Sequence, residues 1–162
     1  MKNEILRQLL HALLGVLILL SGLLKIQYYF IPILFIIGLS IFFIARMGTG
    51  IFSRILESVD RPAEVSFFGP FAFMISAMAS FLLFRHDYAM AGIAILTFSD
   101  SINVIVGKYY GKKRMPHSDK TYIGSLAGFA IGIPAAMLFL PLGSALIAAF
   151  FATLIETFEV ED

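Results

Sequence analysis

The sequence predicts an all-α integral membrane protein, a bundle of about six transmembrane helices forming a single domain over residues 1–162. The chain is 59% hydrophobic and 14% charged, and its mean hydropathy is +0.90. A soluble chain this short exposes a large share of its surface, so it could not hide that much apolar area from water. The apolar residues also fall into runs of about 20, the length with which an α-helix crosses a bilayer core.

The first two spans are predicted at about 5–24 and 28–45, joined by a short turn of Lys25, Ile26 and Gln27. The residues before the first apolar run are polar, and no small-x-small cleavage site follows that run. We therefore expect a retained first helix rather than a cleaved signal peptide.

A polar link at 46–64 separates the second span from the third. Its segment IFSRILESV has apolar residues at helical spacing, which indicates a helix lying in the membrane interface. The third span is predicted at about 65–84, and Arg85, His86 and Asp87 close it.

The fourth span is predicted at about 88–110, and a basic loop follows at 111–120. The next stretch, up to Ile155, contains no charged residue. It is too long for one span and suits two. These last spans are predicted at about 121–140 and 143–158, with Pro141, Leu142 and Gly143 as the turn.

Lysine and arginine are distributed unevenly over the two sides of such a bundle. Six spans place the N-terminus, the 46–64 link, the basic loop and the C-terminus on one side. Of the 12 Lys and Arg residues, Lys25 and Arg85 alone lie on the other side. Because cytoplasmic loops carry an excess of positive charge, the N-terminus and the basic loop are expected in the cytoplasm. The small size favours a prokaryotic plasma membrane over the endoplasmic reticulum.

Asp100 is the clearest functional candidate, since it lies inside a segment apolar enough for lipid. A carboxylate at membrane depth is costly unless it is paired or hydrated, and it marks a functional site by default. Asn103, Gly107 and Gly111 continue its helical stripe. Oxygen ligands at this spacing suit Mg²⁺, which binds one or two carboxylates together with water and phosphate. The alternative is a network of polar side chains that packs helices together.

Glycine and lysine residues follow Asp100 along the chain. Gly107 and Gly111 let the backbone approach a ligand closely, and the basic loop supplies charge for pairing with phosphate. A basic collar that anchors a helix to anionic lipid is the alternative. The position directly after Asp100 favours the phosphate site, although the spacing is not that of a Walker A loop.

Three further patterns are open to two interpretations. Arg7 and His11 share one face of the first helix, which fits either a functional pair or a packed histidine beside a snorkelling arginine. Glu156 is either an ordinary helix-end acid or a second contact for a metal or a lysine. A small-xxx-small ridge of Gly124, Gly128 and Gly132 favours close helix packing.

The other two histidines and the absence of cysteine say less about function. His86 and His117 are expected in loops and are assigned no role. The chain has no cysteine, which excludes disulfides and thiolate metal sites.

Four short motifs occur in order along the chain. R-x-x-x-H-x-x-x-G is present at Arg7, His11 and Gly15. D-x-x-N-x-x-x-G-K-x-x-G-K is present at Asp100, Asn103, Gly107, Lys108, Gly111 and Lys112. K-T-x-x-G-S is present at Lys120, Thr121, Gly124 and Ser125. E-x-x-x-x-x-D is present at Glu156 and Asp162. Together these motifs, with the Glu64–Phe73 stretch around Gly69, resemble the CTP-dependent lipid kinases of the dolichol kinase and phytol kinase group, which are related to phosphatidate cytidylyltransferases.

The resemblance implies a kinase that transfers the γ-phosphate of CTP to the hydroxyl of a lipid alcohol. An isoprenoid alcohol such as dolichol, phytol or geranylgeraniol is the first expectation, and diacylglycerol the second. The family continues beyond its late motif with a further span, so a short or truncated member is expected here.

The resemblance also implies roles for named residues. Asp100, His11 and Lys120 are expected to be catalytic, and whether His11 or Asp100 accepts the hydroxyl proton stays open. Asp100 is expected to hold Mg²⁺, with Asn103 or Glu156 completing the site. The nucleotide is expected to contact Arg7, Asn103, Gly107, Lys108, Gly111, Lys112, Thr121, Gly124 and Ser125.

Two other classes of function stay open at this point. A phosphatidate cytidylyltransferase-like enzyme would release pyrophosphate and leave a CDP-lipid. A non-catalytic transport or assembly protein would bind no nucleotide. The expected partners are the lipid alcohol, the nucleoside triphosphate and the bilayer, with no nucleic acid and with a homo-oligomer left open.

Overall fold

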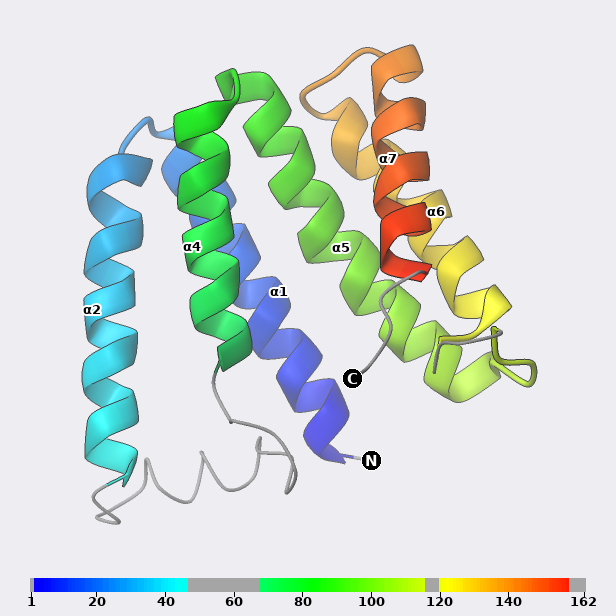
Figure 1. The fold of residues 1–162 in the computed structure, drawn as a ribbon, viewed down its shortest axis with the longest axis horizontal. Coiled ribbons are helices and arrows are strands. Elements are labelled where there is room, and N and C mark those ends of the chain that lie inside the picture. The colour runs from blue at the N-terminus through cyan, green and yellow to red at the C-terminus, as the bar shows by residue number, and fades with distance from the viewer. Residues whose placement is uncertain (1, 47–67, 116–119, 158–162) are drawn as a thin grey trace.

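The protein is described by a computed structural model over residues 2–46, 68–115 and 120–157 (Figure 1). These residues form six α-helices and no strand, which confirms the all-α prediction for the described part of the chain. The helices are α1 Lys2–Leu23, α2 Gln27–Arg46, α4 Phe68–Leu83, α5 His86–Tyr110, α6 Tyr122–Met137 and α7 Leu142–Thr157. The predicted interfacial helix within 46–64, His117 and Asp162 lie outside the described residues.

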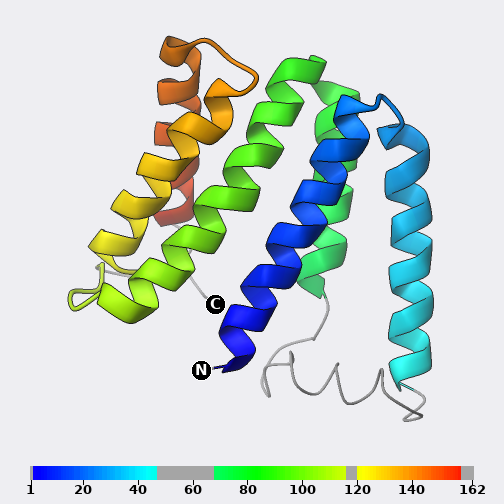
Figure 2. The same cartoon turned by 180° about the vertical axis from the view of Figure 1, so that it is seen from behind.

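The longest helix, α5, is the centre of the bundle. It packs against α1 and α4 on one side and against α6 and α7 on the other, while α2 packs at the edge against α1 and α4. Successive helices run in opposite directions, so α1, α4 and α6 begin at the same end of the bundle at which α2, α5 and α7 end (Figure 2). This arrangement brings the flanks of the predicted basic loop to the end where α1 begins.

Three of the described helices are long and apolar enough to cross a membrane, namely Ile5–Leu23, Gln27–Ile44 and His86–Tyr110. The shorter apolar helices are Gly69–Leu83, Tyr122–Met137 and Leu142–Glu156. Large apolar side chains such as Ile36 on α2 and Ile147 on α7 are well exposed on the outside. These features suit a protein surrounded by lipid, and six membrane crossings stay a prediction.

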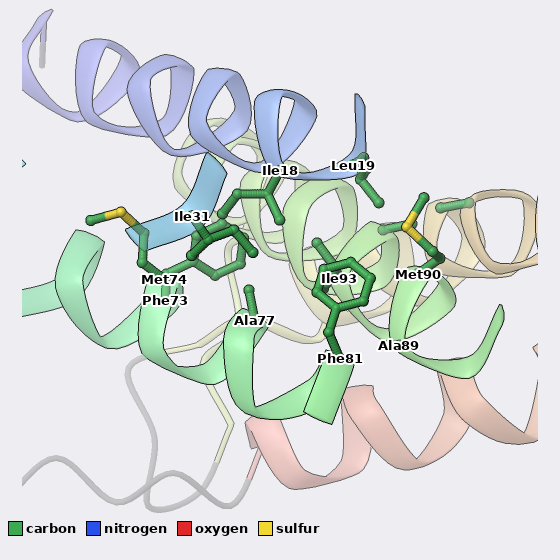
Figure 3. Packing of buried hydrophobic residues seen from close by; sticks show 12 residues of the cluster. Ile18, Leu19, Ile31, Phe73, Met74, Ala77, Phe81, Ala89, Met90 and Ile93 are labelled. Atoms are coloured by element: carbon green, nitrogen blue, oxygen red, sulfur yellow. The ribbon is translucent and has the colours of Figure 1, made fainter. Parts of the chain in front are cut away.

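The main apolar core lies among α1, α2, α4 and α5. Figure 3 shows its side chains interdigitating, among them Ile18, Ile31, Phe73, Phe81 and Met90. A second, smaller cluster joins α5 to α6 and α7 and is built mainly from alanines, such as Ala136, Ala145 and Ala149. Small side chains let these three helices approach more closely than leucines would.

The glycine ridge of α6 packs directly against α5, which confirms the packing interpretation of its spacing. A methyl group added at Gly124 or Gly128 would meet Asn103 or Ser99, one turn apart on α5. At Gly132 it would lie in ordinary contact with Ile95, a further turn along. The two stripes run antiparallel, so each glycine faces a different turn of α5.

The predicted turn after the first span is confirmed except at its last residue. Lys25 has a left-handed φ of 58°, and the amides of Lys25 and Ile26 donate to the carbonyls of Gly22 and Ser21. This pattern is a Schellman motif, which satisfies the carbonyls at the end of α1. Gln27, predicted in the turn, is instead the first residue of α2.

Two other predicted turns are shifted. His86 and Asp87 are not a loop: they begin α5, and the His86 ring lies 5.6 Å from that of Phe81. Asp87 suits the first turn of a helix because its charge complements the helix dipole. Leu142 and Gly143 likewise belong to α7. The prediction was wrong there because a proline fits directly before a helix, so Pro141 ends the turn rather than opening it.

Gly15→Ala is expected to destabilise the bundle by about 1–3 kcal/mol, the usual cost of overpacking a core. The added methyl would collide with the Thr97 side chain. Thr97 is fully buried and donates to the Ile93 carbonyl, so it cannot move aside. Gly143→Ala is the matched control, since nothing lies within 4 Å of its added methyl. The midpoint of thermal unfolding, followed by circular dichroism in detergent, should fall for Gly15→Ala and stay unchanged for Gly143→Ala. Equal midpoints for the two variants would contradict the packing of Gly15 against Thr97.

Candidate functional site

Figure 1 shows that α1 and α6 begin in the same half of the bundle in which α5 and α7 end. Polar side chains from four parts of the chain meet in this half. We call this group the polar cluster. Its members are Arg7, His11, Asp100, Asn103, Lys120 and Glu156. All six were predicted from the sequence as site residues, although they are up to 149 positions apart in the chain, the separation of Arg7 from Glu156 (156 − 7).

Glu156 joins three elements within the polar cluster. Its Oε1 accepts hydrogen bonds from Asn103 Nδ2 of α5 at 2.5 Å and from Lys120 Nζ at 2.7 Å. The Lys120 and Glu156 side chains are 23% and 18% exposed, so this ion pair is largely shielded from water. Charge-assisted bonds of this kind are stronger than neutral ones, and they fix the end of α7 against α5 and the start of α6.

Asp100 lies beside His11 without bonding to it. Asp100 Oδ2 is 4.0 Å from His11 Nε2, which is too far for a direct hydrogen bond. His11 Nε2 is buried and has no hydrogen-bond partner among the described residues. Asp100 is 30% exposed, so this carboxylate is reachable from outside, whereas His11 Nε2 is closed off from solvent.

Charges surround Asp100 on several sides. It interacts electrostatically with Glu156, Lys120 and Arg7. Two carboxylates from different helices thus face a shared region. A positive charge near them would relieve their mutual repulsion. Lys120 supplies part of that positive charge.

The donor set suits Mg²⁺ only with help from a substrate. Within the described segments, no group of three or more His, Cys, Asp or Glu side chains is placed to hold a metal ion. Asp100 and Glu156 provide two carboxylates, and Mg²⁺ commonly binds one or two carboxylates and completes its shell with water and phosphate oxygens. These two residues therefore fit a metal that arrives with a nucleotide rather than a permanently bound one.

Thr121 has a structural role at the start of α6. Its side-chain oxygen accepts a hydrogen bond from the Gly124 amide at 3.2 Å, which caps the helix. Its side chain also lies against Gly107 and Gly111, so it fills the space that those glycines leave. The structure gives these glycines a packing role, and their predicted contact with a nucleotide stays a prediction.

The flanks of the basic loop pair with each other, which the sequence did not indicate. Arg114 and Thr121 form an isolated antiparallel bridge, and the Met115 amide donates to the Lys120 carbonyl at 2.8 Å. This pairing places Lys120 next to α7. Short bridges leave little trace in a sequence that lacks alternating apolar residues.

The remaining predicted residues lie around the polar cluster. Lys108 and Lys112 are exposed near the end of α5. Ser125 is buried on α6 and faces a groove between α6 and α7. One neighbour was missed: the Phe73 ring packs 4.7 Å from that of His11 and holds the imidazole in place. Phe73 entered the sequence analysis only as the last residue of the Glu64–Phe73 stretch, which assigned it no role.

Comparison with known proteins identifies no relative, since no protein-family model, no curated protein and no solved structure matches this chain. The functional argument therefore rests on the residues of the chain and on their arrangement.

Proposed function

We propose that this protein is an integral membrane kinase that transfers the γ-phosphate of CTP to the hydroxyl of a lipid alcohol. One observation carries the proposal: Asp100 of α5 and Glu156 of α7 meet beside Lys120 at a partly exposed end of an apolar bundle. Paired carboxylates with a lysine are suited to a metal–triphosphate, because phosphoryl transfer depends mainly on positioning and on neutralising charge. The four-motif resemblance supplies CTP and the lipid alcohol.

Each charged group has a role in this proposal. Asp100 and Glu156 would hold Mg²⁺, which when bound neutralises charge on the phosphates. Lys120 is bonded to Glu156 and interacts electrostatically with Asp100. It would contact the same phosphates by exchanging part of its bond to Glu156 for the nucleotide. Lys108 and Lys112 add positive charge at the rim, where they attract the triphosphate.

The proposed transfer forms one bond to phosphorus and breaks another. The oxygen of the lipid hydroxyl forms a bond to the γ-phosphorus, and the bond between that phosphorus and the β–γ bridging oxygen breaks. CDP leaves with the bond electrons. The hydroxyl proton passes to His11 Nε2 or to Asp100; the unpartnered Nε2 is free to accept it.

The proposed placement in the membrane follows from charge. The polar cluster would face the cytoplasm of a prokaryotic cell, since the positive residues gather at that end. The alcohol would lie in the bilayer with its hydroxyl raised to the cluster. All six described helices would then cross the membrane, with α4, α6 and α7 as short spans.

The test is transfer of labelled phosphate by the purified protein in lipid nanodiscs. We expect label from γ-labelled CTP to enter dolichol, phytol, geranylgeraniol or diacylglycerol in the presence of Mg²⁺, and label from α-labelled CTP not to. Chelation of Mg²⁺ should stop the transfer. ATP in place of CTP tests the choice of nucleotide.

The same assay separates the alternatives. Entry of the α-label with release of pyrophosphate would replace the kinase by a cytidylyltransferase. Transfer to none of these alcohols, together with no binding of CTP, would contradict both enzymes and leave a non-catalytic membrane protein.

A further inference from the structure

An open groove runs along the outside of the bundle between α6 and α7. Its volume is about 320 Å³, and its lining includes Met115 of the basic loop. Sites for small molecules span roughly 300–1,000 Å³, so this groove could take a single hydrocarbon chain.

One face of α6 forms one wall of the groove. Tyr122, Ser125, Leu126 and Phe129 line it at intervals of three and four residues. The opposite wall is formed by Phe150, Thr153 and Leu154 of α7. The lining is thus apolar except for two hydroxyl groups.

The Ser125 hydroxyl is unusual among those of the described helices. Ser125 is 4% exposed, and its Oγ has no hydrogen-bond partner within the described part of the chain. Six other serine and threonine hydroxyls, including that of Thr153, donate to a carbonyl three or four residues earlier in their own helix. A buried hydroxyl without a partner is unfavourable, so the Ser125 position favours a ligand that supplies one.

The end of the groove near Met115 adjoins the polar cluster. Lys120 directly precedes Thr121, the cap residue of α6, and Thr153 lies one turn before Glu156 on α7. The Lys113 ammonium lies 5.8 Å from the centre of the Tyr122 ring. A molecule in the groove would therefore have its chain among apolar residues and its polar end next to the basic segment.

We propose that the groove between α6 and α7 binds a lipid alcohol, with the chain along the two helices and the alcohol oxygen hydrogen-bonded to Ser125. The identification of this alcohol as the substrate rests on the proposed kinase function. The resemblance assigns Ser125 to nucleotide binding; the groove assigns it to the acceptor lipid.

The hydroxyl contact should decide which lipid binds. Lipid tails are as apolar as the groove, so moving a chain from bilayer to groove gains little. The hydrogen bond to Ser125 is therefore what would make an alcohol bind more tightly than a chain without a hydroxyl. Its loss should weaken binding by about 2- to 10-fold, as expected for one neutral hydrogen bond.

Tryptophan fluorescence can measure this binding, because the chain contains no tryptophan. Phe150→Trp places a reporter in the groove, and Phe43→Trp places a matched one on the outer face of α2. Both phenylalanines are more than half exposed, so both changes should be tolerated. The probe is a dibrominated long-chain alcohol, whose bromines quench indole on contact, in vesicles of phosphatidylcholine and phosphatidylglycerol.

We expect saturable quenching of Phe150→Trp at low mole fractions of the alcohol, and only proportional quenching of Phe43→Trp. Adding Ser125→Ala to Phe150→Trp should shift the midpoint 2- to 10-fold higher. The matching brominated hydrocarbon should show no saturation. Proportional quenching of both reporters, saturation by the hydrocarbon, or an unshifted midpoint with Ser125→Ala would each overturn the proposal. Proportional quenching of both reporters would indicate bulk lipid as the occupant, and the other two results would indicate a groove that holds a chain without recognising its hydroxyl.

The two proposals fail separately. Saturable binding without phosphate transfer would remove the kinase and leave the lipid groove. Transfer with an unchanged KM for the alcohol in Ser125→Ala would remove the groove and leave the kinase.

Discussion

Asp100→Asn is expected to lower lipid phosphorylation by at least about 10²–10³-fold, the usual cost of removing one group that stabilises transition-state charge. The change keeps the shape of the side chain and removes its negative charge, so a metal–triphosphate would lose one of its two carboxylates. The bundle should not weaken. Asp100 is partly buried and interacts with the like charge of Glu156, and a neutral amide there is easier to bury. Loss of activity without loss of stability is typical of a functional residue.

Asp87→Asn is the matched control for this experiment. Asp87 is an exposed carboxylate on the same helix, in its first turn and at the opposite end of the bundle. Its removal should leave the rate unchanged and cost about 0.3–1 kcal/mol of stability through the helix dipole. Labelled-phosphate transfer and thermal unfolding measured on both variants decide the matter. If Asp100→Asn keeps a rate within about threefold of the parent while Asp87→Asn behaves as stated, the metal role is wrong.

The helices were predictable because the apolar runs of the sequence are separated by polar residues and turn signals. All six described helices coincide with predicted spans, and their ends differ by a few residues. The errors lie at short connections. Gln27 was placed in a turn because it is polar, and Leu142 because it is next to a proline. Helix-capping hydrogen bonds decided the first boundary, and the geometry of proline decided the second.

The polar cluster was predictable only in part. Asp100 and Asn103 share a helix, so their common face follows from the spacing. The contact of Asn103 with Glu156 spans 53 positions and depends on how three helices pack. Spacing carries no information about such packing; for Glu156 the sequence left two interpretations open, and the structure favours the lysine contact. The groove beside Ser125 could not be predicted from the sequence, because it depends on how α6 and α7 pack against each other.

Glu156→Ala is expected to lower the free energy of unfolding by about 1–3 kcal/mol. Removing one partner of a fully buried ion pair costs about 3–5 kcal/mol, and the remaining exposure of this pair reduces that figure. The change would leave both Lys120 Nζ and Asn103 Nδ2 without the oxygen that they now share. For a chain of this size, the midpoint of thermal unfolding should fall by about 2–4 °C per kcal/mol. Circular dichroism in detergent provides the measurement.

Exchanging the two charges separates the structural role of the pair from its functional role. The double variant Lys120→Glu with Glu156→Lys restores an ion pair between the same positions, and the Asn103 amide can turn to offer its oxygen instead. Most of the stability lost in Glu156→Ala should therefore return. Activity should not return, because the lysine has moved from the start of α6 to the end of α7 and a metal has lost its carboxylate on α7. Recovery of both stability and phosphate transfer would show that the pair serves packing alone, whereas recovery of stability alone would show that the nucleotide site depends on which element carries each charge.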